Sequence, residues 1–234
     1  MSHSWNITPA EAIILQEKMR RDVRIVPLNM NAIRYVAGAD VSCMKRDPWL
    51  YASIVVLDMV DMQPVEVATD LRKAVFPYIP GLLSFRESPV ILQAWEKLRL
   101  KPDALICDGH GVAHPRRFGI ASHLGLLLDV PTVGCAKNIL VGRYGSLGEG
   151  AGSRAYLMDG EDIVGAAVRT RANVKPVIVS PGHLSDIDSS INLVIACLRS
   201  YRLPETSRWA HRLANELRTR GLNSPFVPNQ EGSA

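Results

Sequence analysis

"IRYVAGADVSCMKRDPWLYASIVVLDMVDMQPVEVATDLRKAV", residues 33–75, contains three apolar runs separated by short polar turns. The runs cover residues 33–43, 51–59 and 65–75, and they are rich in the β-branched residues that favour strands. Strands joined by such short connections pair antiparallel. The stretch therefore predicts a three-stranded antiparallel meander.

The sequence after this meander changes its pattern. "DALICD" (103–108), "IASHLGLLLD" (120–129) and "PTVGCAK" (131–137) alternate strand, helix and strand, which is typical of parallel β units with a helical crossover. Further strands are predicted at 162–170 and 176–182. Together the two patterns predict an α/β fold with a mixed sheet. No linker divides residues 1–220, so we expect one domain followed by a disordered tail at 221–234.

Four helices are predicted outside this pattern. A capping box at 8–11 opens a helix to about residue 24, and a second helix spans 89–100 with Pro89 in its first turn. Two helices near the C-terminus follow, the first capped by Ser185 with Asp188 at its third position and the second at 206–220.

Composition restricts the class of protein without naming an activity. Of the 234 residues 47% are hydrophobic and 21% charged, which is ordinary for a globular protein, and the net charge of +4 gives only a weak preference for anionic partners. No apolar run approaches the ~18 residues of a membrane span, and no signal peptide precedes the first helix. The four cysteines form no CxxC pair. We therefore expect a cytoplasmic protein with reduced thiols.

Two aspartates share one context. Asp40 closes the run "YVAGAD" and Asp108 closes "ALICD", and ligands of open α/β sheets gather at the carboxyl ends of parallel strands. Glu87 follows nearby at the expected start of a helix. Taken singly, each strand-end aspartate is more simply a turn residue or a helix cap. If the carboxylates meet, their repulsion requires a proton, a cationic side chain or a hard cation such as Mg²⁺ or Mn²⁺.

The segment "DGHGVAHPRR" (108–117) strengthens the case for a binding site. Its glycines allow close approach of a ligand to the backbone, and Arg116 and Arg117 can hold phosphate. His110 and His114 have the spacing of a helical zinc pair, but flanking glycines, Pro115 and the absence of an intervening Glu argue against zinc. One histidine as a proton carrier or phosphate contact and the other as a structural residue is the better interpretation.

The segment "VFPYIPGLLSFRESP" (75–89) is apolar, yet neither helix nor strand accommodates its prolines. Pro77, Pro80 and Gly81 enclose Tyr78 in a stiff turn. The local sequence alone does not indicate a function for this turn. Lys137 follows the strand "TVGCA", where a phosphate contact is favoured over a surface role.

Four motifs, in this order, closely resemble the endonuclease V family, the deoxyinosine 3′ endonucleases: "AGADVS", "PYIPGLLSFRE", "DGHGVAHPRRFGIASHLGLLLDVPTVGCAK" and "YRLPETSRWA". The resemblance spans about residues 34 to 211. It implies a ribonuclease-H-like fold and a DNA repair enzyme that uses Mg²⁺, with Mn²⁺ as a substitute. The implied reaction is hydrolysis of the second phosphodiester bond 3′ to a deaminated base such as hypoxanthine, which leaves 3′-hydroxyl and 5′-phosphate ends. A monomer is expected, and activity on inosine-containing RNA is left open.

The resemblance also implies roles for individual residues. The catalytic set is Asp40, Glu87, Asp108, His114 and Lys137. The metal ligands are Asp40, Glu87, Asp108 and, at the fourth acidic position of the family, His211. The lesion-binding positions are Tyr78, Ile79, Pro80, Gly81, Leu83, Arg86, Gly109, Gly111 and Ile120.

Within that set Tyr78 is the wedge that fills the gap left by a flipped base, and the glycines and apolar residues form the base pocket. Arg86 supports the site or a nearby phosphate. His211 departs from the family pattern because many relatives have Asp there, which leaves the number of bound metals open. Leu184 and Asn138 also depart from it, since they stand where basic residues are common. The latter two departures are expected to weaken phosphate contacts.

Two other classes of protein fit part of the sequence. A small-molecule phosphatase would use the same carboxylates but has no use for an exposed Tyr78. A non-catalytic nucleic-acid binding protein would leave three carboxylates facing a polyanion without a cation, which electrostatics disfavours.

Overall fold

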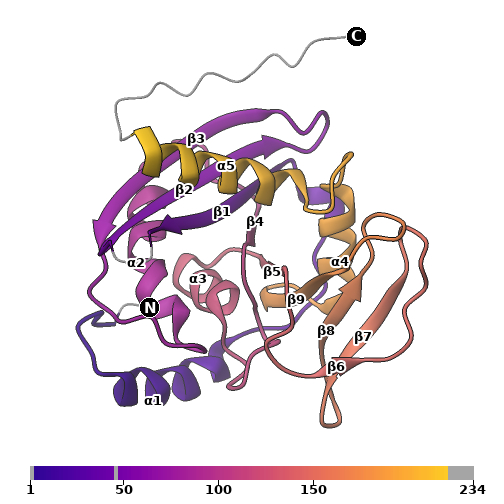
Figure 1. Ribbon diagram of the computed structural model, residues 1–234, viewed down its shortest axis with the longest axis horizontal. Coiled ribbons are helices and arrows are strands. Elements are labelled where there is room, and N and C mark those ends of the chain that lie inside the picture. Colours follow the sequence, from indigo (N-terminus) through magenta and orange to yellow (C-terminus); the bar gives the residue numbers. More distant parts are fainter. Residues whose placement is uncertain (1–2, 45–46, 221–234) are drawn as a thin grey trace.

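The computed structural model describes residues 3–44 and 47–220, and nine strands of these residues form one mixed sheet in the order β3-β2-β1-β4-β5-β9-β8-β7-β6 (Figure 1). The strands are β1 (Tyr35–Cys43), β2 (Trp49–Asp58), β3 (Pro64–Lys73), β4 (Ala104–Cys107), β5 (Thr132–Ala136), β6 (Arg143–Tyr144), β7 (Arg154–Asp159), β8 (Asp162–Val168) and β9 (Val177–His183). The helices are α1 (Pro9–Met19), α2 (Leu83–Glu96), α3 (Ile120–Leu128), α4 (Ile187–Ala196) and α5 (Glu205–Arg220), and short 3₁₀ turns lie at Arg20–Asp22 and Met30–Ala32.

The antiparallel meander and the parallel units are both confirmed. β1 pairs antiparallel with β2 and β2 with β3, while β1, β4 and β5 are parallel. Beyond β5 the sheet is antiparallel through β9, β8, β7 and β6. A meander followed by parallel β/α units is the ribonuclease-H-like mixed sheet that the resemblance implies.

Helices cover both faces of the sheet because the central strands are apolar on both sides. Along β1, Val36 belongs to the core cluster beneath α4 and α5, whereas Ala37 and Ala39 belong to the cluster beneath α2 and α3. This alternation follows from the two-residue period of a strand. Each face of the sheet therefore has its own hydrophobic core.

Gly38 brings α5 unusually close to β1. A Cβ atom at this position would lie 2.1 Å from the carbonyl oxygen of Thr206 in the first turn of α5. No side chain fits there, so glycine lets the helix backbone rest on the strand. This close packing fixes the distance between α5 and β1. It thereby also fixes where the side chains of α5 lie relative to the end of the strand.

Asp40 does not close its strand as the sequence suggested. Its parallel neighbour β4 stops pairing at Ala39, but the antiparallel pairing with β2 continues to Cys43. Asp40 is therefore the first residue of β1 beyond β4 and pairs with Ser53 of β2. Asp108, by contrast, directly follows β4.

The second helix begins earlier than expected, and Pro89 is interior rather than in the first turn. α2 starts at Leu83 because Leu82 and Phe85 pack in one cluster with Phe76, which carries the chain straight from the turn into the helix. Pro89 lacks an N–H, so one helical hydrogen bond is missing at that point. Glu87 is therefore the fifth residue of α2 and not its first.

Three smaller expectations also need correction. The first helix ends at Met19 and continues only as a 3₁₀ turn, and the strands β6 and β7 were not predicted. α4 is capped by Asp186, whose side chain accepts from the Ser189 N–H, because the hydroxyl of Ser185 instead donates to the Thr132 carbonyl. The predicted tail at 221–234 lies outside the described residues.

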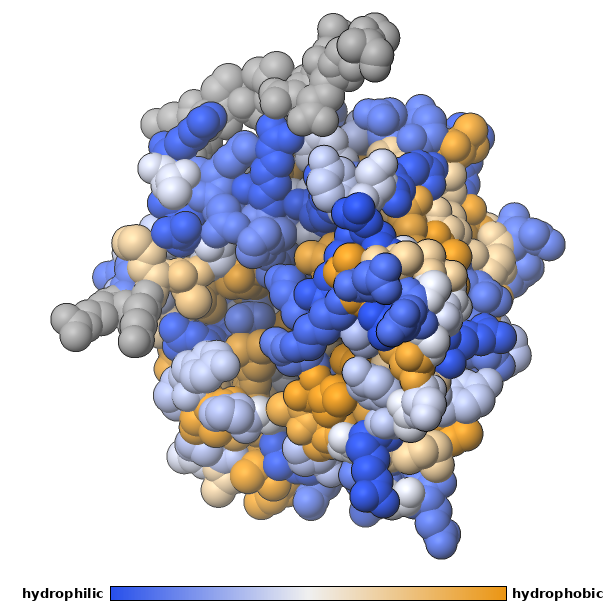
Figure 2. Space-filling view, turned by 45° about the vertical axis from the view of Figure 1, so that its right-hand side comes forward, coloured by the Kyte–Doolittle hydropathy of each residue, from blue (hydrophilic) through white to orange (hydrophobic). Residues whose placement is uncertain are grey.

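The surface is mixed in character. Figure 2 shows hydrophobic residues in several separate places between hydrophilic ones. None of the helices within 3–44 and 47–220 is long and apolar enough to cross a lipid bilayer. The thiols of Cys107, Cys135 and Cys197 are buried and unbridged.

Candidate active site

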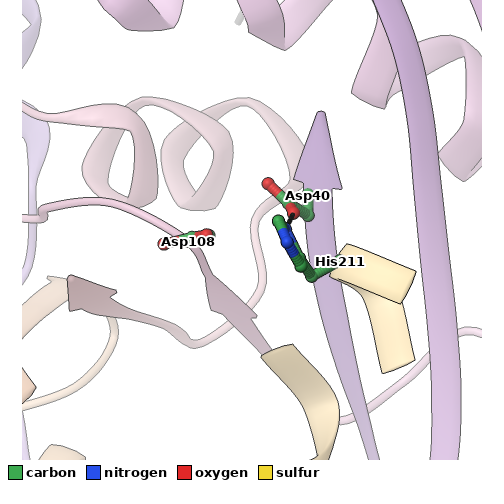
Figure 3. Close-up of side chains that lie close together, drawn as sticks. All are labelled: Asp40, Asp108 and His211. Atoms are coloured by element: carbon green, nitrogen blue, oxygen red, sulfur yellow. Dashed lines mark hydrogen bonds and ion pairs between the residues drawn. The ribbon is translucent and has the colours of Figure 1, made fainter. Parts of the chain in front are cut away.

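Asp40, Asp108 and His211 converge from three elements at one end of the central strands (Figure 3). Asp40 comes from β1, Asp108 follows β4, and His211 comes from α5. Each offers one ligand atom, and these atoms lie within 4.8 Å of one another. The arrangement arises because β1 and β4 are parallel neighbours whose carboxyl ends meet, while Gly38 seats α5 directly above them.

His211 is oriented by hydrogen bonds at both ring nitrogens. Its Nδ1 lies 2.7 Å from Oδ2 of Asp40, and its Nε2 lies 3.1 Å from Nδ2 of Asn215. A carboxylate only accepts, so Nδ1 donates to Asp40 and Nε2 accepts from the amide of Asn215. In this arrangement His211 holds Asp40 in place. To ligate a metal ion through nitrogen, the ring must give up one of these two hydrogen bonds.

Glu87 supplies a third carboxyl group beside those of Asp40 and Asp108. Burial, followed by the charges of Asp40 and Asp108, raises the pKa of Glu87 to about 8. Burial and the charge of Asp108 also raise the pKa of Asp40, against the opposing effect of His211 and Lys137. The three acids are thus close enough to disfavour one another's ionised forms.

Lys137 supplies a positive charge to the same site. Its ammonium group forms an ion pair with Oδ2 of Asp108. Lys137 immediately follows β5, whose parallel pairing with β4 brings the two strand ends together. The backbone at this point is held by Arg202, whose guanidinium donates to the carbonyls of Lys137 and Pro176, each at 2.9 Å.

The donor set fits a hard divalent cation. Two carboxylates and an imidazole lie together, and a third carboxyl group, that of Glu87, has a raised pKa because it is buried and because its neighbours are acidic. Oxygen-rich ligand sets of this kind suit Mg²⁺ or Mn²⁺, and a cation would relieve the repulsion that Lys137 alone leaves. Asp40 and Asp108 would hold it, together with His211 once its ring gives up one hydrogen bond, and Glu87 is the neighbouring carboxyl group that would complete the set.

A small pocket of about 160 Å³ is lined in part by Gly109, the residue that follows Asp108 in the chain. This volume is below the roughly 300–1,000 Å³ of drug-sized ligand sites, so it suits a single flat group. Seven of the residues predicted for lesion binding line it, together with Ser84, His110, His114, Gly119 and Leu140. The seven are Tyr78, Ile79, Pro80, Gly81, Leu83, Gly109 and Ile120.

Glycine is required at two places in the pocket wall. A Cβ atom at Gly109 would lie 2.6 Å from Cγ2 of Ile120, which also lines the pocket. Gly81 has φ +78, a left-handed conformation that other residues rarely adopt. At Gly109 the absence of a side chain leaves room beside Ile120, whereas at Gly81 glycine permits the backbone conformation of the turn.

The carbonyl oxygen of Gly81 accepts hydrogen bonds from three side chains. The donors are Nε2 of Gln16 at 3.1 Å, Nε2 of His114 at 2.9 Å and Nη2 of Arg116 at 2.7 Å. Gln16 is fully buried, and its Oε1 accepts from Nε of Arg116. Nothing in the local sequence distinguished Gln16, because its role depends on Gly81, which is 65 residues away.

His114 lies beneath the turn and not among the carboxylates. Its Nδ1 accepts from the backbone N–H of Arg116, so Nε2 carries the proton given to Gly81. Burial, reinforced by the charge of Arg116, lowers the pKa of His114 to about 4. The ring is therefore neutral near pH 7, and a contact with phosphate requires breaking one of its present hydrogen bonds.

Other predicted residues lie apart from the pocket. Gly111 is buried where a Cβ would clash with Pro181, and Arg86 donates to the carbonyl of Phe76. Arg117 is paired with Asp159 and Asp162, which leaves it committed to the β7–β8 turn.

Leu184 and Asn138, which depart from the family pattern, have structural roles of their own. Leu184 has φ +53, and its N–H donates to the carbonyl of Arg24. The side chain of Asn138 accepts from Nζ of Lys175, so a lysine stands beside the position where the family commonly has one.

Comparisons with known proteins agree with this geometry. The family model described as Endonuclease V matches residues 17–212. Endonuclease V of Gloeobacter violaceus is 52% identical over 225 residues, which cover 92% of this chain and 89% of that protein. The crystal structure of Endonuclease V from Streptomyces avermitilis superposes with a TM-score of 0.87 at 41% identity, covering 94% of this chain and 96% of that one.

A further structural neighbour has been solved with a nucleic acid. It is a variant of Ciona intestinalis Endonuclease V in complex with a 23mer DNA containing an inosine followed by a ribo-adenosine, with a TM-score of 0.80, 27% identity and coverage of 91% of this chain and 99% of that one. The family match, the close relatives and the shared fold give one answer: this chain belongs to the endonuclease V family of nucleases.

Proposed function

We propose that this protein is a DNA repair endonuclease that recognises deaminated bases, chiefly hypoxanthine, and hydrolyses the second phosphodiester bond 3′ to the lesion. The observation that carries the proposal is that the two residues directly after β4 belong to the two parts of the site. Asp108 belongs to the carboxylate cluster, and the next residue, Gly109, lines the pocket. A base held in the pocket therefore lies beside the acids, with its own strand close to them.

The family supports this proposal, as does the bound oligonucleotide of the Ciona intestinalis protein, which contains inosine. That oligonucleotide also contains a ribo-adenosine after the inosine, so inosine-containing RNA is a second substrate to test. A phosphatase acting on small molecules is disfavoured because Tyr78 would have no purpose.

Tyr78 has the properties of a wedge. It is 70% exposed on a turn that Pro77 and Pro80 stiffen, and it stands at the rim of the pocket. An enzyme that tests a base must first remove it from the stack, and an inserted side chain stabilises the vacated position. The turn is held from beneath by the three hydrogen bonds to Gly81, so the ring has a fixed base from which to insert.

The pocket selects by shape and by its backbone groups. Gly81 and Gly109 leave room for a flat ring, whereas Leu83 and Ile120 supply apolar walls. Hypoxanthine lacks the exocyclic amino group of guanine. A wall without a partner for that group disfavours guanine because its buried donors would go unpaired.

The carboxylates hold the catalytic cation. Mg²⁺ bound there, or Mn²⁺ in its place, would activate the attacking water and stabilise charge on the leaving oxygen. Asp40 and Asp108 are the principal ligands, and Glu87 holds the cation or its water once it has lost its proton. Lys137, which is paired with Asp108, would contact the scissile phosphate.

The proposal predicts lesion-specific nicking. With Mg²⁺, a labelled duplex carrying one hypoxanthine should be cut one nucleotide beyond the lesion, with 3′-hydroxyl and 5′-phosphate ends, while the undamaged duplex remains intact. Gel mapping of the ends on DNA, and on a matched strand with inosine in RNA, checks this. Equal cutting of damaged and undamaged duplexes would refute it.

Replacing Tyr78 by Ala should weaken binding to the lesion duplex about tenfold, the effect of losing one base–aromatic contact of about 1–3 kcal/mol. Cleavage of a single strand containing hypoxanthine should change little, because little unstacking is needed. Tyr156→Ala, which removes an exposed tyrosine on β7, serves as the control. Equal losses on duplex and single strand would argue against a wedge.

Replacing Gln16 by Met should loosen the turn that carries Tyr78. Met has a similar volume but leaves the buried Phe118 carbonyl without its Gln16 donor and the Gly81 carbonyl with two of its three donors, at a cost of about 1–3 kcal/mol of unfolding free energy. We expect a higher KM for the lesion duplex with a smaller change in kcat. Gln93→Met, at an exposed position of α2, is the matched control. An unchanged KM would exclude a positioning role for Gln16.

A further inference from the structure

A second cavity, of about 390 Å³, lies at the first turns of α5, away from the base pocket. Three arginines and two aromatic rings dominate its wall, and two acids complete its charged groups. The lining residues are Asp61, Met62, Gln63, Arg199, Ser200, Tyr201, Glu205, Arg208, Trp209 and Arg212. Its volume falls within the roughly 300–1,000 Å³ range of small-molecule sites, so it has room for more than a single base.

Arg208 and Tyr201 form an ordered stack in this cavity. The guanidinium carbon of Arg208 lies 3.3 Å from the centre of the Tyr201 ring. Nη1 of Arg208 also donates to both carboxylate oxygens of Glu205 at 2.7 Å. Because the ion pair with Glu205 and the Tyr201 ring already hold the Arg208 side chain, binding a ligand here costs little additional conformational entropy. Tyr201 remains 46% exposed.

Arg212 repeats this arrangement one helical turn later. Its guanidinium carbon lies 5.3 Å from the Trp209 ring, and its Nε donates to Glu216. Arg199, across the cavity, donates only to carbonyls at the end of α4, and no carboxylate among the described residues pairs with it. The cavity therefore combines flat aromatic and guanidinium surfaces with one arginine, Arg199, for which residues 3–44 and 47–220 supply no acidic partner.

The position of the cavity connects it with the active site. Arg208 precedes His211 by three residues on α5, so the two side chains are neighbours on the same surface of the helix, about 4.5 Å apart along its axis. His211 holds Asp40. α5 therefore carries residues of both the cavity and the active site, whereas the opposite wall of the cavity, Asp61 to Gln63, follows β2 at the end where β1 begins.

We propose that this cavity binds one nucleotide of the substrate strand outside the lesion, with the base against Tyr201 and the phosphate at Arg199. The inference rests on the proposed function for the identity of the strand. Aromatic rings interleaved with arginines are a typical platform for single-stranded nucleic acid, because every base has a face to stack and every linkage carries a negative charge. The site is independent of base identity and lengthens the footprint of the enzyme.

The test measures the affinity for hypoxanthine strands whose flanks are shortened stepwise from either end. Fluorescence anisotropy with Ca²⁺ in place of Mg²⁺ limits cleavage during the measurement. The variants are Tyr201→Ala and Arg199→Ala, and the controls are Tyr156→Ala, which has the same 46% exposure, and Arg154→Ala on the distant strand β7. Arg199→Ala keeps the test valid if Tyr201→Ala disturbs the Arg208 stack.

Tyr201→Ala should weaken binding of the long strand about tenfold. Arg199→Ala should make the binding constant less dependent on salt concentration, by about the slope that one phosphate contact contributes. Both effects should vanish once one flank falls below a definite length, and the controls should behave as wild type. Losses that persist on the shortest strand, or equal affinities of all proteins for the longest, would overturn the proposal. Competition by adenosine monophosphate as strong as by the strand would show a free-nucleotide site instead.

An undamaged single strand of the longest length separates this inference from the proposed function. Its binding should depend on Tyr201 and Arg199 in the same way, because the cavity does not contact the lesion. If that dependence holds while the protein fails to nick hypoxanthine duplexes, the proposed function fails and the binding site stands. If the protein nicks hypoxanthine duplexes but its binding of the undamaged strand does not depend on Tyr201 and Arg199, the proposed function stands and the binding site is refuted.

Discussion

Replacing Asp40 or Asp108 by Asn is expected to lower the rate of strand cleavage by about 1,000-fold or more. Each substitution removes a negative ligand from the group in which Asp40, Asp108 and His211 meet. A catalytic cation supplies several kcal/mol of charge stabilisation, and each 1.4 kcal/mol corresponds to a factor of ten in rate. Single-turnover nicking of the hypoxanthine duplex at saturating protein measures the loss.

Lesion binding by the same variants should persist, because neither carboxylate lines the pocket. Asp129→Asn is the control, since that side chain is 78% exposed at the end of α3. If either aspartate variant retains activity within tenfold of wild type, the carboxylates are not the catalytic centre.

Replacing Glu87 by Gln is expected to stabilise the metal-free protein while it abolishes cleavage. The pKa of Glu87 is raised from an ordinary 4.5 to about 8, first by burial and then by its acidic neighbours. Below about pH 4.5 the folded and unfolded chains are both protonated here. Between pH 4.5 and 8 only the unfolded chain releases the proton, so the free energy of unfolding falls across this window and stays low above it.

Glutamine keeps the neutral form at every pH and avoids this loss. At pH 8, with EDTA present, the variant should therefore be more stable by about 2–4 kcal/mol, and at pH 4.5 the two proteins should be nearly equal. Urea unfolding at both pH values measures the difference. Glu96→Gln, on an exposed position of the same helix, should show no such trend. A wild type that is as stable as Glu87→Gln at pH 8 would contradict the acidic environment described for Glu87.

Much of the fold could be predicted from the sequence because its strands carry strong local signals. The apolar runs of β1, β2 and β3 and their short turns determine the meander, and the alternation around Asp108 determines the parallel units. β7 was missed because "RAYLMD" (154–159) follows a glycine-rich loop and has only weak alternation. The start of α2 was missed because buried packing of Leu82 and Phe85 outweighs the local effect of the prolines.

The candidate site was predictable where the chain itself brings residues together, and less so where tertiary contacts decide. Asp108 and Gly109 are adjacent, so the link between acids and pocket is already present in the motif. The orientation of His114, by contrast, depends on the Gly81 carbonyl, and the backbone of Lys137 is held by Arg202. Gln16 and Arg202 join segments far apart in the chain, and no local pattern signals such contacts.

The central claim is that the carboxylates of Asp40, Asp108 and Glu87 hold a divalent cation that cleaves the strand beside a base in the adjoining pocket. The most direct test is the initial rate of nicking of a hypoxanthine duplex by EDTA-treated protein during titration with Mg²⁺. The account predicts no cleavage without the cation, and a saturable rise on adding Mg²⁺ that Asp108→Asn abolishes. Full activity in EDTA, or an Asp108→Asn variant that responds to Mg²⁺ as wild type does, would contradict it.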